Sequence, residues 1–193
     1  MDALAKQLAE DVQGLRNRIQ RHASERATGR KDAGKPNEAE RRAAEAEGYI
    51  SSPLPDPSPE ERADLETNLR DLAAEVRAPE ETDEQALERV RASRYVTRMV
   101  ADPHWPFFDA EHRADRVLLT VNTQHPFYAN VYAPLEAMDA PDDGDHPLVG
   151  LQMTLLSLAR TQISLSGASN ENQRLFKSMR DQWSIALKEQ MQG

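Results

Sequence analysis

The sequence RVLLTVNTQHPFYANVY, residues 116–132, decides the fold of this chain. Its first half alternates in the manner of a β-strand. One face of that strand would carry Val117, Leu119 and Val121, and the other Leu118, Thr120 and Asn122. The alternation predicts a half-buried strand in a sheet that is apolar on one side. The strand is expected to end at Asn122, because Asn-Thr-Gln supplies turn and helix-capping groups.

A short amphipathic helix is predicted directly after this strand. Pro126 suits a first helical turn, where its missing N–H costs nothing, and Pro134 is expected to limit the helix. His125 stands at the strand-to-helix turn, where a general base could act, but no Ser, Cys or carboxylate adjoins it in a nucleophile arrangement. We therefore expect a structural role, in which His125 caps the turn or packs beside Phe127, Tyr128 and Tyr132.

The surrounding sequence predicts a small α/β module over residues 102–193. The aromatic residues at 105–108 indicate a first strand, and residues 110–115 a polar connection, so that two strands form a β-hairpin. Two helices with apolar faces are expected to cover this hairpin. Their apolar residues are Leu148, Leu151, Leu155, Leu158 and Ile163 in one, and Leu175, Phe176, Met179, Trp183 and Leu187 in the other.

The N-terminal part, residues 1–50, is predicted to be helical and similar to a coiled coil, with a hinge near residues 28–36. Its apolar stripe has the spacing of a helix-on-helix seam and consists of Leu4, Leu8, Val12, Leu15 and Ile19. Asn37 and Glu40 have the spacing of a capping box for a short helix that ends near Gly48.

Residues 51–58 are rich in proline and predict an extended linker. A partner-docking peptide is the alternative, but no aromatic or basic anchor flanks the prolines. Residues 59–101 predict a pair of helices. The first has apolar residues at Leu65, Leu69, Leu72 and Val76. The second begins with the capping pair Thr82 and Gln85 and is expected to present Leu87, Val90 and either Val96 or Met99 to a core.

The predicted fold class is therefore α+β and predominantly α-helical. It combines long N-terminal helices with a small module, in which a β-hairpin is packed by three C-terminal helices. The apolar fraction of 38% and the aromatic fraction of 5% are low, so part of the 193-residue chain is expected to be solvated helix or linker. The chain has no cysteine, secretory signal or membrane-spanning run, which together indicate a cytoplasmic protein.

The pattern N-T-x-H-P-F-Y-x-x-x-Y of residues 122–132 resembles the C-terminal region of bacterial ATP-binding proteins of the GHKL superfamily. This group includes gyrase B, histidine kinases and the ninety-kilodalton heat-shock chaperones. The resemblance covers roughly residues 102–190. It includes the stretches WPFFDAEHRADR, LVGLQMTLLSLARTQ and RDQWSIALKEQ. The helical region before residue 102 is similar to the coiled-coil-rich insert that such proteins carry upstream.

The resemblance does not extend to the ATPase itself. The GHKL fold holds its nucleotide with an Asn on a helix, an Asp followed by a Gly-rich turn, and a glycine-rich lid. The glycines of this sequence are isolated, and it has no G-x-G and no P-loop pattern. We therefore expect no cofactor in this chain and no enzymatic activity of its own. The resemblance implies an ATPase whose nucleotide site lies outside these 193 residues.

The net charge of −9 argues against general affinity for nucleic acid, which requires a concentrated positive face. One basic stretch lies at residues 16–35. It comprises Arg16, Arg18, Arg21, Arg26, Arg30, Lys31 and Lys35. A solvated helix face is the favoured interpretation of this stretch, and DNA contact is the weaker alternative.

Three classes of function follow from the sequence. The first is a non-catalytic C-terminal coupling region of a GHKL-type ATPase, which mediates subunit or partner contacts. The second is a stand-alone adaptor that recruits a partner, or a second copy, by its helical seam or by strand addition at the hairpin edge. The third is a metal-dependent hydrolase. Its ligands would be His104, Asp109, Glu111 and His112, although their spacing matches no compact metal site.

Overall fold

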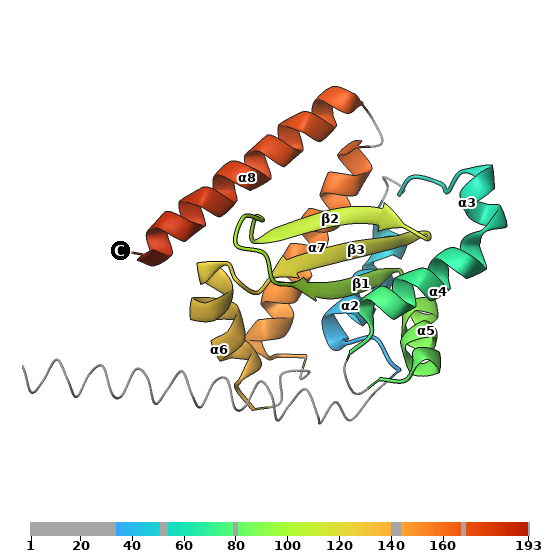
Figure 1. Cartoon of the computed structure of the whole chain (residues 1–193), viewed down its shortest axis with the longest axis horizontal. Helices are drawn as coiled ribbons and strands as arrows, with labels where there is room; N and C mark the ends of the chain where they lie inside the picture. The colour runs from blue at the N-terminus through green and yellow to red at the C-terminus, as the bar shows by residue number, and fades with distance from the viewer. Residues whose placement is uncertain (1–33, 51–53, 79–80, 140–143, 167–168, 193) are drawn as a thin grey trace, which may run out of the picture.

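The computed structural model describes residues 34–50, 54–78, 81–139, 144–166 and 169–192 (Figure 1). The predicted seam from Leu4 to Ile19 and most of the basic stretch lie outside these residues. Of the predicted hinge only residues 34–36 are described, and Gly34 there has a φ of +89°, which favours glycine. The described residues form an α+β fold that is mostly helical and contains a three-stranded mixed sheet packed by helices.

The first described helix confirms the predicted capping box. Helix α2 spans Glu38–Ala46 and continues into the 3-10 turn η1, Glu47–Tyr49. The Glu40 N–H donates to Asn37 Oδ1 at 2.8 Å, and the Asn37 N–H donates to Glu40 Oε2 at 3.1 Å. Both groups are donors that a helix N-terminus otherwise leaves without a partner. The helix accordingly begins at the position that the sequence indicates.

The predicted pair of helices after the proline-rich segment is also present. Helices α3 (Pro59–Ala63) and α4 (Leu65–Val76) are followed by α5 (Asp83–Ala92). Thr82 caps α5, because its Oγ1 accepts from the Gln85 N–H at 3.2 Å. The apolar stripe of α4 packs against α5. This packing buries Leu69, Leu72, Ala73, Val76, Ala86 and Val90.

Strand β1, Tyr95–Val100, was predicted as part of the preceding helix, and that prediction is wrong. Helix α5 ends at Ala92, and Ser93 adopts an extended conformation. The Ser93 Oγ accepts from the Tyr95 N–H at 3.0 Å, which holds the chain away from the helix. Residues 95–100 are rich in β-branched residues, which favour a strand. Their partner is β3, paired in parallel far along the chain, and local sequence cannot reveal such a pairing.

The predicted hairpin exists, but its first strand lies further along the chain than expected. Strand β2 spans Phe108–Arg113, so most of the predicted polar connection is strand. Strand β3 spans Arg116–Asn122 and pairs with β2 antiparallel. Ala114 and Asp115 form the turn, with φ angles of 52° and 55°. Two successive positive φ angles are typical of a type I′ hairpin turn, for which Asn-Gly is the usual sequence signal. Ala-Asp lacks that signal.

Strand β3 is central in the order β1-β3-β2, and it is buried on both faces. The prediction of a half-buried strand is therefore wrong. Val117, Leu119 and Val121 face the larger core, with helix α7 (Pro147–Ser166) and α2. Leu118 faces a second core with α4 and α5. Figure 1 shows α7 behind the strands and α4 and α5 on the other side. Helices on both faces therefore enclose the strand that the sequence marks out.

The short helix after β3 forms, but Pro134 does not end it. Residues Tyr128–Tyr132 make the π-helical turn η2, and α6 follows over Ala133–Glu136. The Ala133 N–H donates to the Tyr128 carbonyl five residues back. This wider turn precedes the proline, which has no N–H to donate, and the helix then continues through it.

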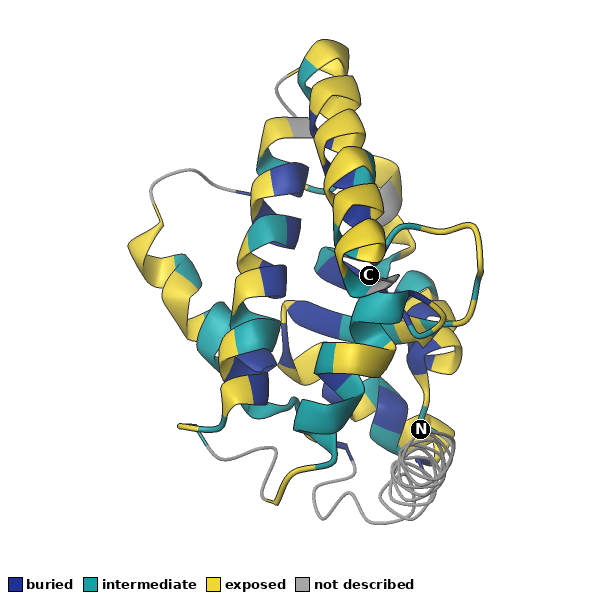
Figure 2. Ribbon diagram, turned by 90° about the vertical axis from the view of Figure 1, so that its left-hand side faces the viewer, coloured by how far each residue is buried: buried dark blue, intermediate teal, exposed yellow. Residues whose placement is uncertain are grey.

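The last helix, α8, spans Asn170–Gln192, and only part of its predicted apolar face packs on the core, namely Phe176 and the partly buried Leu187. Its buried residues are Phe176, Arg180 and Ser184. Leu175, Met179 and Trp183, which were predicted to close the core, are 69%, 52% and 40% exposed. Figure 2 shows how much of α8 is exposed. Among the described residues, no helix is long and apolar enough to cross a membrane.

A buried ion pair fixes the end of α4 against α5. The Arg89 Nε donates to Glu81 Oε1 at 2.8 Å, and Arg89 Nη2 donates to the Val76 carbonyl at 2.9 Å. The two charged side chains are 3% and 0% exposed. Removing one partner of such a pair leaves the other charge buried without compensation.

We expect Arg89→Met to lower the free energy of unfolding by about 3–5 kcal/mol. The exposed Arg91, which pairs with Glu66, provides the control, and Arg91→Met should cost less than about 1 kcal/mol. Urea denaturation followed by circular dichroism measures both values. Equal losses in the two variants would contradict the importance of the buried pair.

Candidate functional site

The link between β1 and β2 crosses the sheet at one end. Strands β1 and β3 are parallel neighbours, and the chain passes over their carboxyl ends to reach β2 on the far side of β3. The turn at residues 122–126 begins at this same end. In open α/β sheets, ligands bind outside the carboxyl ends of the parallel strands, and the pair β1 and β3 has this arrangement. The candidate site is therefore sought between these two loops and the helix beside them, α8.

Asn122 holds the two loops together. Its Nδ2 donates to the carbonyls of Asp102 at 2.7 Å and Trp105 at 2.9 Å. Its Oδ1 accepts from the N–H groups of Asp102 at 3.2 Å and Gln124 at 3.0 Å. The side chain is 1% exposed, so each of these bonds satisfies a group that water does not reach. Asn122 thereby determines the shape of the loops over the strand ends.

His125 joins the turn to α8. Its Nδ1 accepts from the Phe127 N–H at 3.2 Å, so Nε2 carries the proton of the neutral ring. Nε2 lies 3.1 Å from both the carbonyl and the Oγ of Ser184 and donates to these oxygens. Ser184 Oγ also accepts from the Phe107 N–H at 2.8 Å. The predicted capping of the turn by His125 is thus part of a chain of bonds that reaches α8.

The environment of His125 favours its neutral form. Burial lowers the pKa of His125, and the nearby charge of Lys188 lowers it further, while the bond to the Ser184 carbonyl acts in the opposite direction. The net shift is downward from the ordinary value of 6.5. Protonation at Nδ1 would also set a donor against the Phe127 N–H.

Arg180 anchors the middle of α8 to the edge strand β2. It is 3% exposed at its side chain and forms ion pairs with Asp109 of β2 and with Asp181. Gln162 of α7 donates to the Ala110 carbonyl on the same strand at 3.2 Å. A buried guanidinium requires carboxylate partners, which explains why the polar stripe of α8 faces inward.

Aromatic rings fill the space beneath these bonds. Phe107 is fully buried, and its ring centroid lies 4.7 Å from that of Phe127, 5.5 Å from His125 and 6.4 Å from Trp183. Such tilted pairs contribute stability beyond their buried area. Tyr132 lies apart from this group. It is buried beside α7, where its hydroxyl accepts from Gln152 Nε2 at 2.8 Å.

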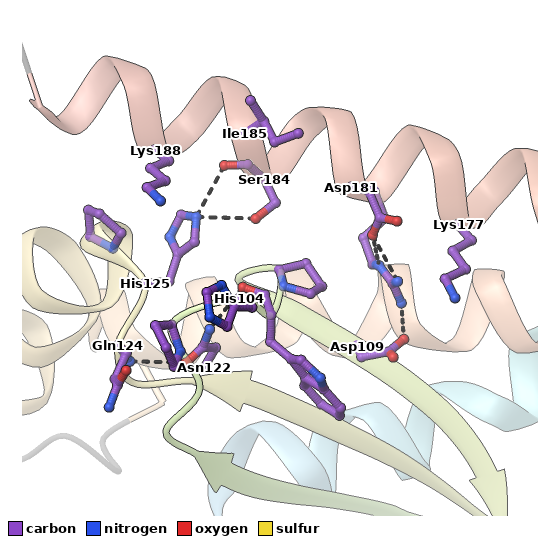
Figure 3. Close-up of a pocket in the computed structure, with 15 residues that line it drawn as sticks. His104, Asp109, Asn122, Gln124, His125, Lys177, Asp181, Ser184, Ile185 and Lys188 are labelled. Carbon is purple, nitrogen blue, oxygen red and sulfur yellow. Dashed lines mark hydrogen bonds and ion pairs between the residues drawn. The ribbon is translucent and has the colours of Figure 1, made fainter.

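A cleft of about 680 Å³ lies between α8 and the two loops (Figure 3). The link contributes residues 103–106, and the turn contributes Asn122, Gln124, His125 and Pro126. Residues of one side of α8 complete it, namely Lys177, Arg180, Asp181, Ser184, Ile185 and Lys188. The cleft thus joins segments that are widely separated in sequence.

The structure gathers four of the candidates named from the sequence. Asn122 and His125 line the cleft, and Phe127 and Trp183 pack beside it on Phe107. Tyr132 is a core residue outside it, and the five seam residues lie outside the described part of the chain. Sequence analysis missed Arg180, Ser184 and the cleft lysines. In the sequence these residues appear only as polar positions on one side of a helix. Such positions predict an exposed face unless the partners on β2 and at His125 are known.

The four residues considered as metal ligands do not gather. His104 lies in the link, whereas Asp109, Glu111 and His112 belong to β2. Asp109 is already paired with Arg180. Over the described residues, there is no group of three or more His, Cys, Asp or Glu side chains that could hold a metal ion.

Comparisons with protein-family models, with curated proteins and with solved structures give no match. The resemblance to GHKL-superfamily proteins therefore stays a prediction, and the site has to be interpreted from its own geometry.

The lowered pKa of His125 makes the stability of the fold depend on pH. Unfolded chains take up a proton at His125 near pH 6.5, whereas the folded chain resists this proton, so stability is complete above that pH and falls below it. We expect His125→Gln to reduce the slope of unfolding free energy against pH between about pH 5.5 and pH 7.5. Gln124→Asn, at an exposed neighbour, is the control and should keep the original slope. Equal slopes in the wild type and both variants would contradict the lowered pKa of His125.

The bonds of Asn122 predict a severe effect of an isosteric change. Asn122→Asp would replace the amide NH2, which donates to the carbonyls of Asp102 and Trp105, by a carboxylate oxygen that faces both carbonyls. We expect a loss on the order of 3 kcal/mol in unfolding free energy at neutral pH, partly regained when the carboxyl is protonated at low pH. The exposed Asn130 is the matched control, and Asn130→Asp should be nearly neutral. Chemical denaturation at neutral and at low pH measures the unfolding free energy of both variants. An N122D chain as stable as the wild type at neutral pH would contradict the prediction.

Proposed function

We propose that this chain is a non-catalytic coupling region of a GHKL-type ATPase and that it acts through contacts between helices. The observation that carries the proposal is the apolar flank of α8, which consists of Leu175, Met179 and Trp183. These residues recur every four positions on a 23-residue helix, and they are 69%, 52% and 40% exposed. Exposed apolar groups in such a row are typical of an interaction surface.

The exposure of this flank follows from how α8 is bound. Ion pairs of Arg180 and the bonds of Ser184 hold α8 by a polar stripe. Successive helical residues are about 100° apart, so the apolar residues at 175, 179 and 183 are turned to the side of that stripe. Rotating the helix to bury them would expose Phe176 and break the ion pair to Asp109. The flank therefore remains available to a partner.

Strand addition, the other route to a partner, is poorly supported. On the outer edge of β1, Glu40 Oε1 accepts from the Thr97 N–H at 2.8 Å, and Ser93 Oγ accepts from the Tyr95 N–H. On the outer edge of β2, the Ala110 N–H donates to Asp109 Oδ1, and the Ala110 carbonyl accepts from Gln162. An added strand would need these same backbone groups. Contact through a helix is therefore the favoured mode.

A metal hydrolase receives no support from the described residues, since its proposed ligands are dispersed and Asp109 is paired with Arg180. A second copy of this chain is the occupant that we propose for the flank. Most oligomers are built from identical subunits, and a two-fold contact places the same apolar row on both sides. The seam predicted at Leu4 to Ile19 suits the same kind of contact.

We expect the chain to form a dimer in solution and Met179→Glu to shift it to the monomer, because the substitution places a charge in the apolar contact. Ser178→Glu is the matched control, since it adds the same charge at the adjacent exposed position outside the flank. Light scattering over a range of concentrations measures the mass. A wild-type monomer, or equal effects of the two variants, would contradict self-association through this flank.

The coupling to an ATPase has a separate test. A GHKL-type ATP-binding domain, either encoded in frame with this chain or cross-linked to it in the cells that produce it, would support the coupling role. Cross-linking of the chain to itself alone would favour the stand-alone interaction protein. The Met179→Glu variant shows whether either cross-link depends on the flank.

A further inference from the structure

We propose that the cleft between α8 and the two loops binds a small organic anion, with a carboxylate or phosphate group on a flat apolar body. This binding site is distinct from the apolar flank, because the α8 residues that line the cleft are not those of the flank. The inference therefore goes beyond the proposed contact between subunits.

The position and the size of the cleft suit a ligand. It lies outside the carboxyl ends of the parallel pair β1 and β3, where sheets of this kind bind ligands. Its volume of about 680 Å³ lies within the range of roughly 300–1,000 Å³ that small-molecule sites occupy.

One wall of the cleft is held in place without a ligand. Asn122 bonds both loops, and His125 and Ser184 bond each other across the boundary between the turn and α8. These polar groups are buried and have partners already. They therefore keep the loops in one arrangement, which lowers the entropic cost of ordering the site when a ligand binds.

Other polar side chains of the cleft are free to bind. Within the described part of the chain, the side chains of Lys177, Lys188, Gln124 and His104 form no hydrogen bond or ion pair. They come from α8, from the turn and from the link. Figure 3 shows Lys188 extending from α8 toward His125 of the turn, and Lys177 extending from α8 toward β2 near Asp109. Donors from three separate segments thus line one cleft.

The charges of the cleft favour an anion. Its two carboxylates, Asp109 and Asp181, are both paired with Arg180. The lysines have no such partner in the cleft, so positive charge remains uncompensated there, in a chain whose net charge is −9. Ammonium and amide N–H groups donate hydrogen bonds, and carboxylate and phosphate oxygens accept them.

Apolar residues in the lining of the cleft suit an apolar body. Trp105 is 37% exposed and lies between Pro103, His104 and Pro106 in the link. Pro126 lines the opposite loop. An indole and proline rings in this lining provide apolar surface for an aromatic or planar group. The ligand class is therefore an aryl carboxylate or an aryl phosphate rather than an inorganic ion.

Tryptophan fluorescence tests this proposal, because the chain has only two tryptophans and Trp183→Phe leaves Trp105 as the reporter. Phenyl phosphate or benzoate should change this fluorescence with saturation, and comparison of the two separates phosphate from carboxylate recognition. Inorganic phosphate and the uncharged benzyl alcohol should bind at least about tenfold more weakly, since each lacks one of the two recognised parts. Should W183F lose its helical circular dichroism, calorimetry on the wild-type chain measures the same affinities.

Lys177→Gln and Lys188→Gln should each weaken binding about three- to tenfold, because each removes one charge from the cleft. Arg174→Gln is the control, since Arg174 lies on α8 but does not line the cleft, and it should leave affinity unchanged. Absence of saturable binding by both anions would overturn the proposal, as would equal binding of benzyl alcohol or an equal effect of R174Q. Met179→Glu should still bind the anion with saturation, because Met179 does not line the cleft, so a failure of the dimer contact and a failure of anion binding can be told apart.

Discussion

Burial of β3 on both faces and pairing on both edges is the constraint on which the fold depends. A central strand in this situation needs apolar cover from two layers, and α7 with α2 supplies one while α4 with α5 supplies the other. Glu47 ties the first layer together, because its carboxylate accepts from Arg160 of α7 at 2.7 Å and from the Tyr95 hydroxyl of β1. Burial raises the pKa of Glu47, but these bonds outweigh burial and hold it below its ordinary value.

The second consequence of the central strand is the position of α8. Both faces of β3 are occupied by other helices, so α8 packs beside α7 and reaches the edge strand β2 and the loops over the strand ends with its side chains. There the available partners are polar, namely Asp109, the Phe107 N–H and His125. An inward-facing Arg180 and Ser184 match them, Phe176 is buried beside them, and Leu175 and Met179 are left exposed. The orientation of α8 that these polar pairs hold thus places the apolar flank on one side of the helix and the cleft lysines on the other.

Sequence predicted those features that depend on neighbouring residues. The caps at Asn37 and Thr82 satisfy donors within the same turn of chain, and each helix begins where its cap predicts. Features that depend on distant partners were not predictable. Strand β1 is a strand because β3 pairs with it, and the Ala114–Asp115 turn has positive φ angles without the usual residues. The inward face of α8 depends in the same way on β2 and on His125.

The same helix carries the proposed dimer contact and one wall of the proposed binding site, and this has a thermodynamic consequence. An anion bound by Lys177 and Lys188 of α8 and by Gln124 of the turn would join α8 to the loops and oppose any separation of the two. Trp183 of the flank packs against Phe107 and Phe108, so a partner that covers the flank would contact α8 in this docked position. Binding free energies coupled through one element are reciprocal, so each ligand would raise the affinity for the other. His125, bonded to Ser184, lies at the junction through which such coupling passes.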